Sequence, residues 1–539
     1  MLKRIRFLLF FAALLGLFMT FNSSSLVLAE DEEEDEKQGE KEGDKPPEQD
    51  VGENPDFYAR RGIKKADVDA AVEKACAFLK AGQQADGSIP GPSGTQAANY
   101  PMGSTALACF ALLKGGVPRT DPVIQKGLKF CREHWSASAD HPDANKGGNT
   151  QGRMMRPSKT YSISCLILAL EAWYAPRPPK TKKEKQKSMT APYEERVKKN
   201  FARFAGAADK KLMKELVDWL LSKQERNIWR YPGKAGNSQP VEDASNTQYV
   251  ALALNAARRC NVPIGKDVWK RMADYFIREQ DKDGPEVKPF RVPGADSSIR
   301  NLKREGKRIM KELKKAFKKE ARKARSKKDK DEEKGDMDSG PRTAPVDEKK
   351  LFGNEKHEMK ARGWSYVTKS APKDDPKSFT VTSGSMTTSG VAALMIAKAA
   401  LEGYGGWKSG YGKKGNQAIR DGCAWLARNF SATMNPSLGQ HYHLYYLYGL
   451  ERAGVLSLCM QLGAHDWYAE GAKWFLANQS GDGHWPGDST CGDIANTCFG
   501  ILFLKRATTP VIELPRDTFT GASLFNPKKK DENVARPGK

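Results

Sequence analysis

The residues best placed to do chemistry form one polar motif that occurs twice. Residues 243–247 and 493–497 both spell Asp-x-x-Asn-Thr, and each copy opens a strongly hydrophobic segment. Carboxylates held in a partly dry cavity have perturbed pKa values and can act as acids, bases or ligands. The alternative is helix capping, since Asp, Asn and Thr are favoured at helix starts and an acid complements the helix dipole.

A histidine pair next to a run of tyrosines supplies further candidates. Gln440–Tyr446 reads QHYHLYY. The candidate catalytic set is Asp243, Asp493 and His443, whose carboxylates and imidazole can transfer protons. The candidate cavity-lining or ligand-binding residues are Asn246, His441, Tyr442, Asn496 and Trp485. For the histidines, a helix cap or a polar cavity wall is the alternative.

Signatures of several common sites are absent from the sequence. There is no Gly-rich phosphate loop, no GxSxG nucleophile elbow and no HExxH. Zinc needs three or four N, S or O ligands, and the reversed pair Cys491-Gly-Asp493 with the earlier histidines does not complete such a set. We therefore predict no cofactor, since neither Zn nor Mg has a full motif.

The elements that must position these residues are repeats. Lys74–Ile89 and Glu470–Gly487 share an aromatic residue, a Gln five positions later and then Asp-Gly. Tyr275 with Gln280, and Trp219 with Gln224, repeat the beginning of this pattern. Self-similarity spread over a chain indicates a repeat architecture.

Each repeat is predicted to pair an amphipathic helix with a more hydrophobic one. The amphipathic helices carry an aromatic residue at the motif position: Phe78, Phe130, Trp219, Tyr275, Trp425 and Trp474. The hydrophobic helices are predicted at Ala106–Lys114 (capped by Ser104 or Thr105), Ser162–Tyr174, Asn246–Arg259, Thr388–Leu401, Tyr442–Ala453 and Asn496–Lys505. A helix that is apolar on nearly all sides must be buried on all sides. Six hairpins follow.

This pattern resembles the QW repeat, (K/R)(G/A)xx(F/Y/W)(L/I/V)xxxQxxxGxW, of the terpenoid cyclase and protein prenyltransferase superfamily. The resemblance runs from about Lys65 to Arg506 and implies an all-α fold, an (α/α)6 toroid of six helical hairpins. The DxDD acid of class II cyclases is absent, and the zinc residues of the prenyltransferases are not matched in order. The resemblance therefore supports the fold more than any reaction.

The two ends of the chain have the composition of targeting and solvated segments. Residues 1–29 resemble a secretory signal peptide that ends near Ala29, so we expect an exported protein, periplasmic or extracellular. An uncleaved anchor is the alternative. Residues 30–57 are acidic and nearly free of apolar residues, which predicts a disordered leader. The toroid is predicted over 58–510, with a tail at 511–539.

Two charged insertions interrupt the predicted toroid. One is a Lys- and Pro-rich loop at 176–206. The other spans 285–362, because Gln280 and Gly284 begin a repeat loop that Gly363 and Trp364 complete. Within it, residues 300–330 hold much of the formal charge of +23. This basic helix predicts an anionic partner or, alternatively, a solvated linker; nucleic acid is not expected, because stacking aromatics are scarce.

Composition bounds the remaining expectations. The 539 residues are 39% hydrophobic and 29% charged, which suits a large globular body diluted by charged segments. The nine cysteines mostly fall in apolar helical segments and are predicted to be largely free thiols. We expect a monomer. The leading functional expectation is binding of an apolar or lipid ligand, or of a protein partner; the alternatives are an isoprenoid-lipid enzyme and an interaction protein that uses its basic arm.

Overall fold

The computed structural model describes residues 55–91, 100–143, 159–176, 193–225, 227–231, 243–327, 348–353, 357–367 and 380–512. The chain divides into two units, Met1–Asp50 and Val51–Lys539, and every described residue belongs to the second. The predicted signal peptide, nearly all of the acidic leader, residues 177–192 of the predicted 176–206 loop and nearly all of the tail lie outside the described residues.

Helices dominate the described residues, so the prediction of an all-α fold is confirmed. The strands there form two short antiparallel pairs. One pair joins β1 (Glu286–Val287) to β2 (Met359–Lys360), and the other joins β3 (Gln461–Leu462) to β4 (His465–Asp466). No helix in the described ranges is both long enough and apolar enough to cross a membrane.

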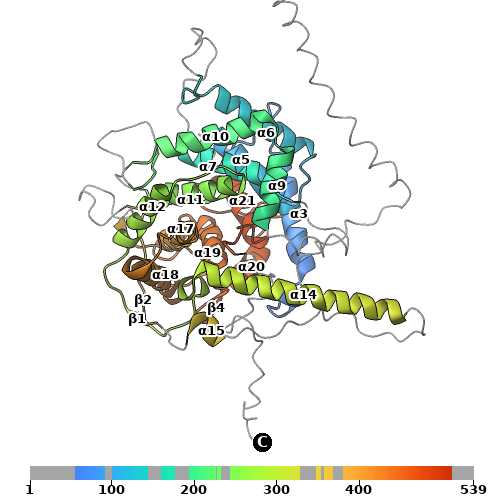
Figure 1. The fold of residues 1–539 in the computed structure, drawn as a ribbon. Coiled ribbons are helices and arrows are strands. Elements are labelled where there is room, and N and C mark those ends of the chain that lie inside the picture. The colour runs from blue at the N-terminus through green and yellow to red at the C-terminus, as the bar shows by residue number, and fades with distance from the viewer. Residues whose placement is uncertain are drawn as a thin grey trace, which may run out of the picture. The chain divides into compact units, whose positions relative to one another are not determined.

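Twelve of the helices alternate between two kinds along the chain. The buried helices, inaccessible on nearly all sides, are α5 (Pro101–Gly115), α7 (Thr160–Trp173), α11 (Ala244–Arg259), α17 (Gly384–Gly403), α19 (His443–Ser457) and α21 (Gly492–Leu504). The amphipathic helices are α3 (Lys65–Ala81), α6 (Pro122–Ser136), α10 (Ala207–Ser222), α12 (Lys266–Glu279), α18 (Ser409–Arg428) and α20 (Trp467–Ala477). Figure 1 shows the buried helices toward the middle of the view and the amphipathic helices around them.

The predicted cap of the first buried helix is wrong. α5 begins at Pro101, so Ser104 and Thr105 lie inside the helix and do not cap it. Proline fits the first helical position because its missing N–H would have no partner there. The freed Thr105 hydroxyl instead accepts from the backbone N–H of Ile89 at 2.8 Å.

The buried helices contact one another in an order that returns to its start. α5 packs on α7, α7 on α11, α11 on α17, α17 on α19, α19 on α21, and α21 on α5. The first and last amphipathic helices, α3 and α20, also touch. No buried helix in this succession is left without a neighbour on either side.

Neighbouring buried helices run in the same direction. Within their first two turns, a Cβ added to Gly103 of α5 would lie 2.6 Å from Ser162 Oγ of α7, and Ser389 of α17 contacts Gln248 of α11 at 2.5 Å. At their last turns, Glu171 of α7 pairs with Arg259 of α11 at 2.9 Å. First turns meet first turns and last turns meet last turns, so the helix dipoles add. We call the two ends of this group the amino-end face and the carboxyl-end face.

The repeated glutamine of three loops bridges two helical hairpins. The Nε2 of Gln83 donates to Gly87 O in its own loop and to Val123 O of α6. The Nε2 of Gln479 likewise donates to Gly483 O and to Ala71 O of α3. The Nε2 of Gln280 donates in the same way to Arg362 O and to Ala418 O of α18. The bridge from Gln479 to Ala71 joins residues 408 positions apart.

The tryptophan of three repeat loops, Trp229, Trp364 and Trp485, is tied at both ends. The indole N–H of Trp485 donates to Phe475 O at 2.8 Å, and its backbone N–H donates to Thr497 Oγ1. The same arrangement joins Trp364 to Phe276 O and to Thr387. Thus the amphipathic helix, the loop and the buried helix of a repeat are held together by one tryptophan.

The excursion between Gln280 and Trp364 leaves and returns through β1 and β2. Its near part is integrated with the helices: α13 (Pro293–Asp296) contacts α18 and α19, and Lys398 of α17 donates to Gly294 O and Ser297 O. α14 (Ile299–Lys327) begins with buried Leu302 and Ile309. Figure 1 shows its far end running clear of the other helices. The remaining helices are α2 (Pro55–Ala59), α9 (Tyr193–Phe204) and α15 (Glu348–Phe352). α9 occupies residues 193–204 of the predicted 176–206 loop, so this part of the insertion is helical, with Val197 and Phe201 buried.

Candidate functional site

Seven tyrosines gather at the amino-end face. We call them the tyrosine cluster: Tyr100, Tyr161, Tyr231, Tyr249, Tyr366, Tyr442 and Tyr445. Five of the rings form a chain of contacts, with centroid distances of 6.4 Å for Tyr100 to Tyr231, 5.6 Å for Tyr231 to Tyr161 and 4.8 Å for Tyr161 to Tyr249. Tyr249 stacks on Tyr445 at 6.2 Å. Five repeats contribute to one aromatic surface.

Asp243 lies among these rings as the N-cap of α11. Its Oδ1 accepts from Asn246 N at 2.8 Å, so the capping alternative is confirmed for this copy of the motif. Its Oδ2 accepts from Tyr366 OH at 2.6 Å and from the side-chain amide of Asn246. The residue is only 2% exposed. Capping therefore fixes a carboxylate in a buried aromatic environment.

Burial dominates the electrostatics of Asp243. It raises the pKa of this carboxyl to about 6, against the hydrogen bonds from Asn246 and Tyr366, which lower it. Within the described ranges no lysine or arginine pairs with Asp243. The pKa of the neighbouring Tyr231 phenol is also raised well above its ordinary value, first by burial and then by the Asp243 charge. A buried carboxylate without a cation is costly unless a ligand or a proton neutralises it.

Tyr231 and Tyr366 reach the cluster from equivalent loop positions. Each stands two residues after the tryptophan of its repeat loop, Trp229 or Trp364. The backbone of Tyr366 also accepts from Ala244 N at 3.1 Å, so this loop is held against the start of α11 by both its backbone and its phenol. The corresponding residue of the last repeat is Gly487, where an added Cβ would lie 2.6 Å from Asn496. The last repeat therefore contributes no tyrosine from this loop position.

A buried arginine lies behind the cluster. The Arg452 guanidinium of α19 sits over the rings of Tyr448, Tyr249 and Tyr445, at 4.0, 5.3 and 5.6 Å from their centroids. With the Gln248 amide oxygen turned toward it, Arg452 donates from Nε at 3.1 Å and from Nη2 at 2.6 Å. Aromatic faces stabilise such a desolvated cation. The interior here is filled by side chains that already accommodate one positive charge.

The other two predicted catalytic residues lie in separate surroundings. Asp493 is in the first turn of α21 but is not its cap, and its half-exposed carboxylate lies 3.9 Å from His484 Nε2. His443 is buried, with Nε2 at 3.0 Å from Ala432 O and its ring edge-on to Trp474. Burial lowers the pKa of His443 to about 4. The structure does not join Asp243, Asp493 and His443 into one set among the residues it describes.

The predicted ligand-binding residues are similarly divided. Asn246 and Tyr442 belong to the amino-end face, and Asn246 Oδ1 is buried with no hydrogen-bond partner among the described residues. His441 is exposed, 3.9 Å from Asp488. Asn496 is buried and donates to Asp488 O at 3.3 Å. Trp485 is wholly buried in its repeat loop, where its contacts are with protein.

A metal site does not emerge from the described ranges. No group of three or more His, Cys, Asp or Glu residues there could hold a metal ion. All nine cysteines lie in the described part of the chain; they are free thiols, and eight of them are buried. Burial raises the pKa of each of them, for example that of Cys165 to about 12. These thiols are therefore protonated, apolar packing groups.

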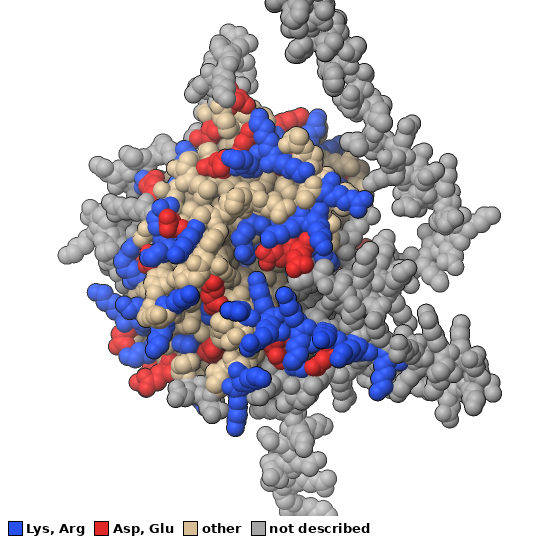
Figure 2. Space-filling model, in the orientation of Figure 1, with Lys and Arg blue, Asp and Glu red and all other residues tan. Residues whose placement is uncertain are grey.

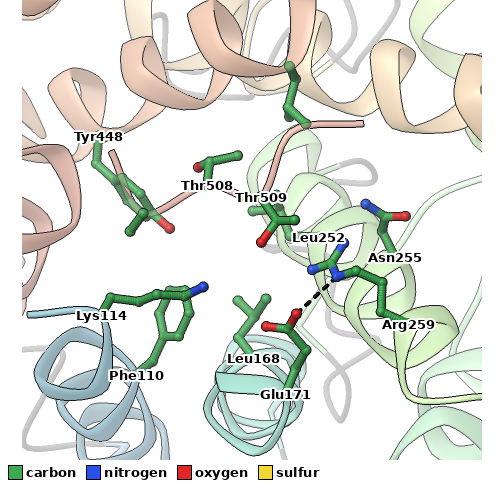
Figure 3. A pocket seen from close by; sticks show the side chains of 12 residues that line it. Phe110, Lys114, Leu168, Glu171, Leu252, Asn255, Arg259, Tyr448, Thr508 and Thr509 are labelled. Atoms are coloured by element: carbon green, nitrogen blue, oxygen red, sulfur yellow. Dashed lines mark hydrogen bonds and ion pairs between the residues drawn. The ribbon is translucent and has the colours of Figure 1, made fainter. Parts of the chain in front are cut away.

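A small cavity opens at the carboxyl-end face (Figure 3). Its volume is about 20 Å³, enough for one or two water molecules. Its lining residues are Phe110, Lys114, Leu168, Glu171, Leu252, Asn255, Arg259, Tyr448, Leu456, Ala507, Thr508 and Thr509. Figure 3 shows the ion pair of Glu171 with Arg259 on one wall and Lys114 on the other. Cations suit this end, because the carboxyl ends of parallel helices carry partial negative charge.

The segment after α21 closes this face over a second buried acid. Glu451 of α19 accepts from Thr508 N at 3.0 Å and from Thr508 Oγ1 at 2.5 Å. Burial raises the pKa of Glu451 to about 7. The Glu451 side chain thus holds the chain in place across the cavity. We assign this face a structural role and the amino-end face the candidate site.

Sequence reasoning found Asp243, Asn246 and Tyr442 but missed the tyrosines around them. The signal was present: Trp-x-Tyr occurs at both Trp229 and Trp364, which places two tyrosines at equivalent loop positions. Tyr161 and Tyr249 lie in hydrophobic helices, where an aromatic residue is ordinarily core. Chemically, the assembled face offers a buried proton donor or acceptor, phenol hydroxyls and aromatic faces.

Comparison with known protein-family models and with curated proteins found no match to this chain.

Proposed function

We propose that this protein is an (α/α)6 toroid of the terpenoid cyclase and prenyltransferase type that serves as a binding protein, with its ligand seated at the tyrosine cluster. The observation that carries the binding role is the gathering of seven tyrosines from five repeats near one buried carboxylate, which pairs with no lysine or arginine of the described residues. Packing alone does not require phenols there, whereas ligand recognition uses apolar surface with a few fixed polar groups. Export from the cell, expected from residues 1–29, is part of this proposal.

The ring itself is supported by the contact order of the buried helices, which returns from α21 to α5. Three repeat loops support it too, because the glutamine of each joins its hairpin to the next, including the last to the first. A closed ring would bury both ends of the repeat series, which an open stack has to cover with polar caps.

Ligand retention by purified protein tests the binding role. The full chain would be purified without detergent and its bound small molecules identified by mass spectrometry, alongside Tyr231→Ala and Tyr404→Ala. Tyr404 is 51% exposed and lies outside the cluster. We expect a stoichiometric ligand in the parent and the Tyr404 variant and at least tenfold less in Tyr231→Ala. Equal ligand content in all three proteins, or none in any, would remove the binding role.

The second candidate is an enzyme acting on an isoprenoid lipid. The specific observation in its favour is Asp243, a carboxyl with its pKa near 6 among aromatic rings, since a buried acid of this kind can deliver a proton at neutral pH. Incubation with a linear polyprene and chromatographic search for cyclised products tests it. Turnover that survives Asp243→Asn would exclude this residue as the acid.

A third candidate uses the basic arm. The exposed basic residues of α14 are Lys303, Arg304, Lys307, Lys311, Lys315 and Lys319. Figure 2 shows a blue band where α14 lies in Figure 1, with smaller red patches beside it. Such a surface attracts anionic partners in a salt-dependent manner. Binding to an anionic surface that weakens steeply with salt would favour this role.

A further inference from the structure

We propose that the tyrosine cluster and Asp243 bind the alkylammonium group of a ligand, with the N–H donors directed to Asp243 and Asn246 and the attached carbons against the tyrosine rings. The proposal rests on the binding role proposed above and names the chemical class of the ligand. Its source is either a small amine or a lysine side chain of a partner.

Asp243 is a buried acid with no cationic partner among the described residues. Asp243 is 2% exposed, and its described partners are hydrogen-bond donors without formal charge, from Asn246 and Tyr366. A buried carboxylate without a countercharge is unfavourable by several kcal/mol in general. A cationic ligand that arrives at this position supplies the missing charge.

An unused hydrogen-bond acceptor, Asn246 Oδ1, lies beside that carboxylate. Asn246 Oδ1 is buried and has no hydrogen-bond partner among the described residues, while the amide nitrogen of the same side chain donates to Asp243. An ammonium group carries several N–H donors and no acceptor. It can therefore satisfy the Asn246 oxygen and the carboxylate together, which a neutral alcohol with one O–H cannot.

Tyrosine rings form the wall of the site. Tyr100, Tyr161, Tyr231 and Tyr366 are each only partly buried, whereas Asp243 is buried. Approach from solvent toward the carboxylate therefore passes aromatic rings, which attract cations through their faces. Arg452 shows that this cluster accepts a positive charge on its inner side, where the guanidinium lies 5.3 Å and 5.6 Å from the ring centroids of Tyr249 and Tyr445.

The groups facing Asp243 define how binding depends on pH. They are the phenols Tyr366, Tyr231 and Tyr161, all of which stay neutral because burial raises their pKa values. The cation requires the ionised carboxylate, so affinity should rise as pH increases from 5 to 8. The amine itself stays protonated across this range, since its ordinary pKa is near 10.

Isothermal titration calorimetry on the full chain at low ionic strength tests the proposal. The probes are n-butylammonium, its neutral analogue n-butanol, and a blocked lysine (N-acetyl-lysine methylamide). The variants are Asp243→Asn, which keeps a good capping residue, Tyr231→Leu, which removes one ring but keeps apolar volume, and the surface control Asp218→Asn. Near-ultraviolet circular dichroism confirms that each variant is folded.

We expect n-butylammonium to bind and n-butanol not to bind. Asp243→Asn should weaken binding by about tenfold or more, Tyr231→Leu by about threefold to tenfold, and Asp218→Asn not at all. Tighter binding of the blocked lysine than of n-butylammonium would identify a partner's lysine as the source, and equal binding a small amine.

Unchanged affinity in Asp243→Asn, equal binding of n-butanol, or no binding of either cation would overturn the proposal. These outcomes are separate from failure of the binding role. A neutral co-purifying ligand that Tyr231→Ala loses would keep the binding role while excluding the cation. Absence of both would exclude the binding role and the cation together.

Discussion

At the scale of single residues, one capping position determines both a helix start and the character of the candidate site. The two copies of Asp-x-x-Asn-Thr are equivalent in sequence, yet Asp243 caps α11 in a buried position while Asp493 is half-exposed in the first turn of α21. The difference comes from what packs above each start. Tyr366 covers the first, whereas the second faces His484 at the surface.

The raised pKa of Asp243 predicts a pH-dependent stability. In the native state the Asp243 carboxyl keeps its proton up to about pH 6. In the unfolded chain it loses the proton near the ordinary pKa of an aspartate. Native Asp243 binds more protons between these values, so its contribution to stability falls as pH rises from about 4 to 6. The difference in free energy of unfolding between Asp243→Asn and the parent should therefore be about 2 kcal/mol more favourable to the variant at pH 7.5 than at pH 4.5.

Urea unfolding of both proteins at the two pH values measures this change. Asp218→Asn is the matched control, since its carboxylate is 55% exposed. A difference between Asp243→Asn and the parent that is the same at both pH values would show that Asp243 is not a buried, titrating acid.

At the scale of elements, the repeat loops depend on a few glycines that approach a backbone closely. Gly483 has φ +98°, and a Cβ there would lie 2.4 Å from Lys74 O in α3. Gly483→Ala should cost about 3 kcal/mol or more, because a positive φ and a backbone clash coincide. Gly481→Ala, two residues away and with nothing within 4 Å of an added Cβ, should stay within about 0.5 kcal/mol of the parent.

Urea unfolding of these two variants tests the loop. Hydrogen exchange adds a more specific readout, since the clash is with α3. Faster exchange in α3 is expected for Gly483→Ala alone. Equal stability of the two alanine variants would mean that the loop does not bear on α3.

The basic excursion divides at a point within α14. Leu302 is 1% exposed where α14 packs on α17, so Leu302→Ala should cost about 2–4 kcal/mol. Replacing residues 311–347 with a flexible Gly/Ser linker should leave the urea midpoint unchanged and lower the salt concentration that elutes the protein from a cation exchanger. A large loss of stability on that replacement would show that the far part of α14 belongs to the folded core.

At the scale of the whole molecule, the two ends of the described chain meet. The Arg506 guanidinium lies 3.9 Å from the centre of the Phe57 ring, and Tyr468 packs on the same ring. A circular permutant that joins Ile512 to Pro55 through a short linker and opens the chain between residues 183 and 184 should therefore fold. We expect cooperative unfolding and a helical circular-dichroism spectrum close to the parent's.

A second permutant, opened in the middle of α7, is the control and should fail to fold, because it breaks a buried helix. Failure of the first permutant with the same linker would contradict the meeting of the ends and, with it, the proposed ring.

The sequence alone determined the alternation of amphipathic and buried helices, because hydrophobic periodicity is a local property that each segment carries by itself. It also indicated which loop residues recur, and Gln83, Gln280 and Gln479, with the loop tryptophans, do make the inter-helix bonds. Only the tertiary structure decided which polar residues share a site. Tyr231, Tyr366 and Asp243 come from three segments, and their neighbourhood depends on how the helices pack around one another, a non-local outcome that spacing along the chain does not encode. For the same reason His443 and Asp493, which the sequence grouped with Asp243, lie in other surroundings.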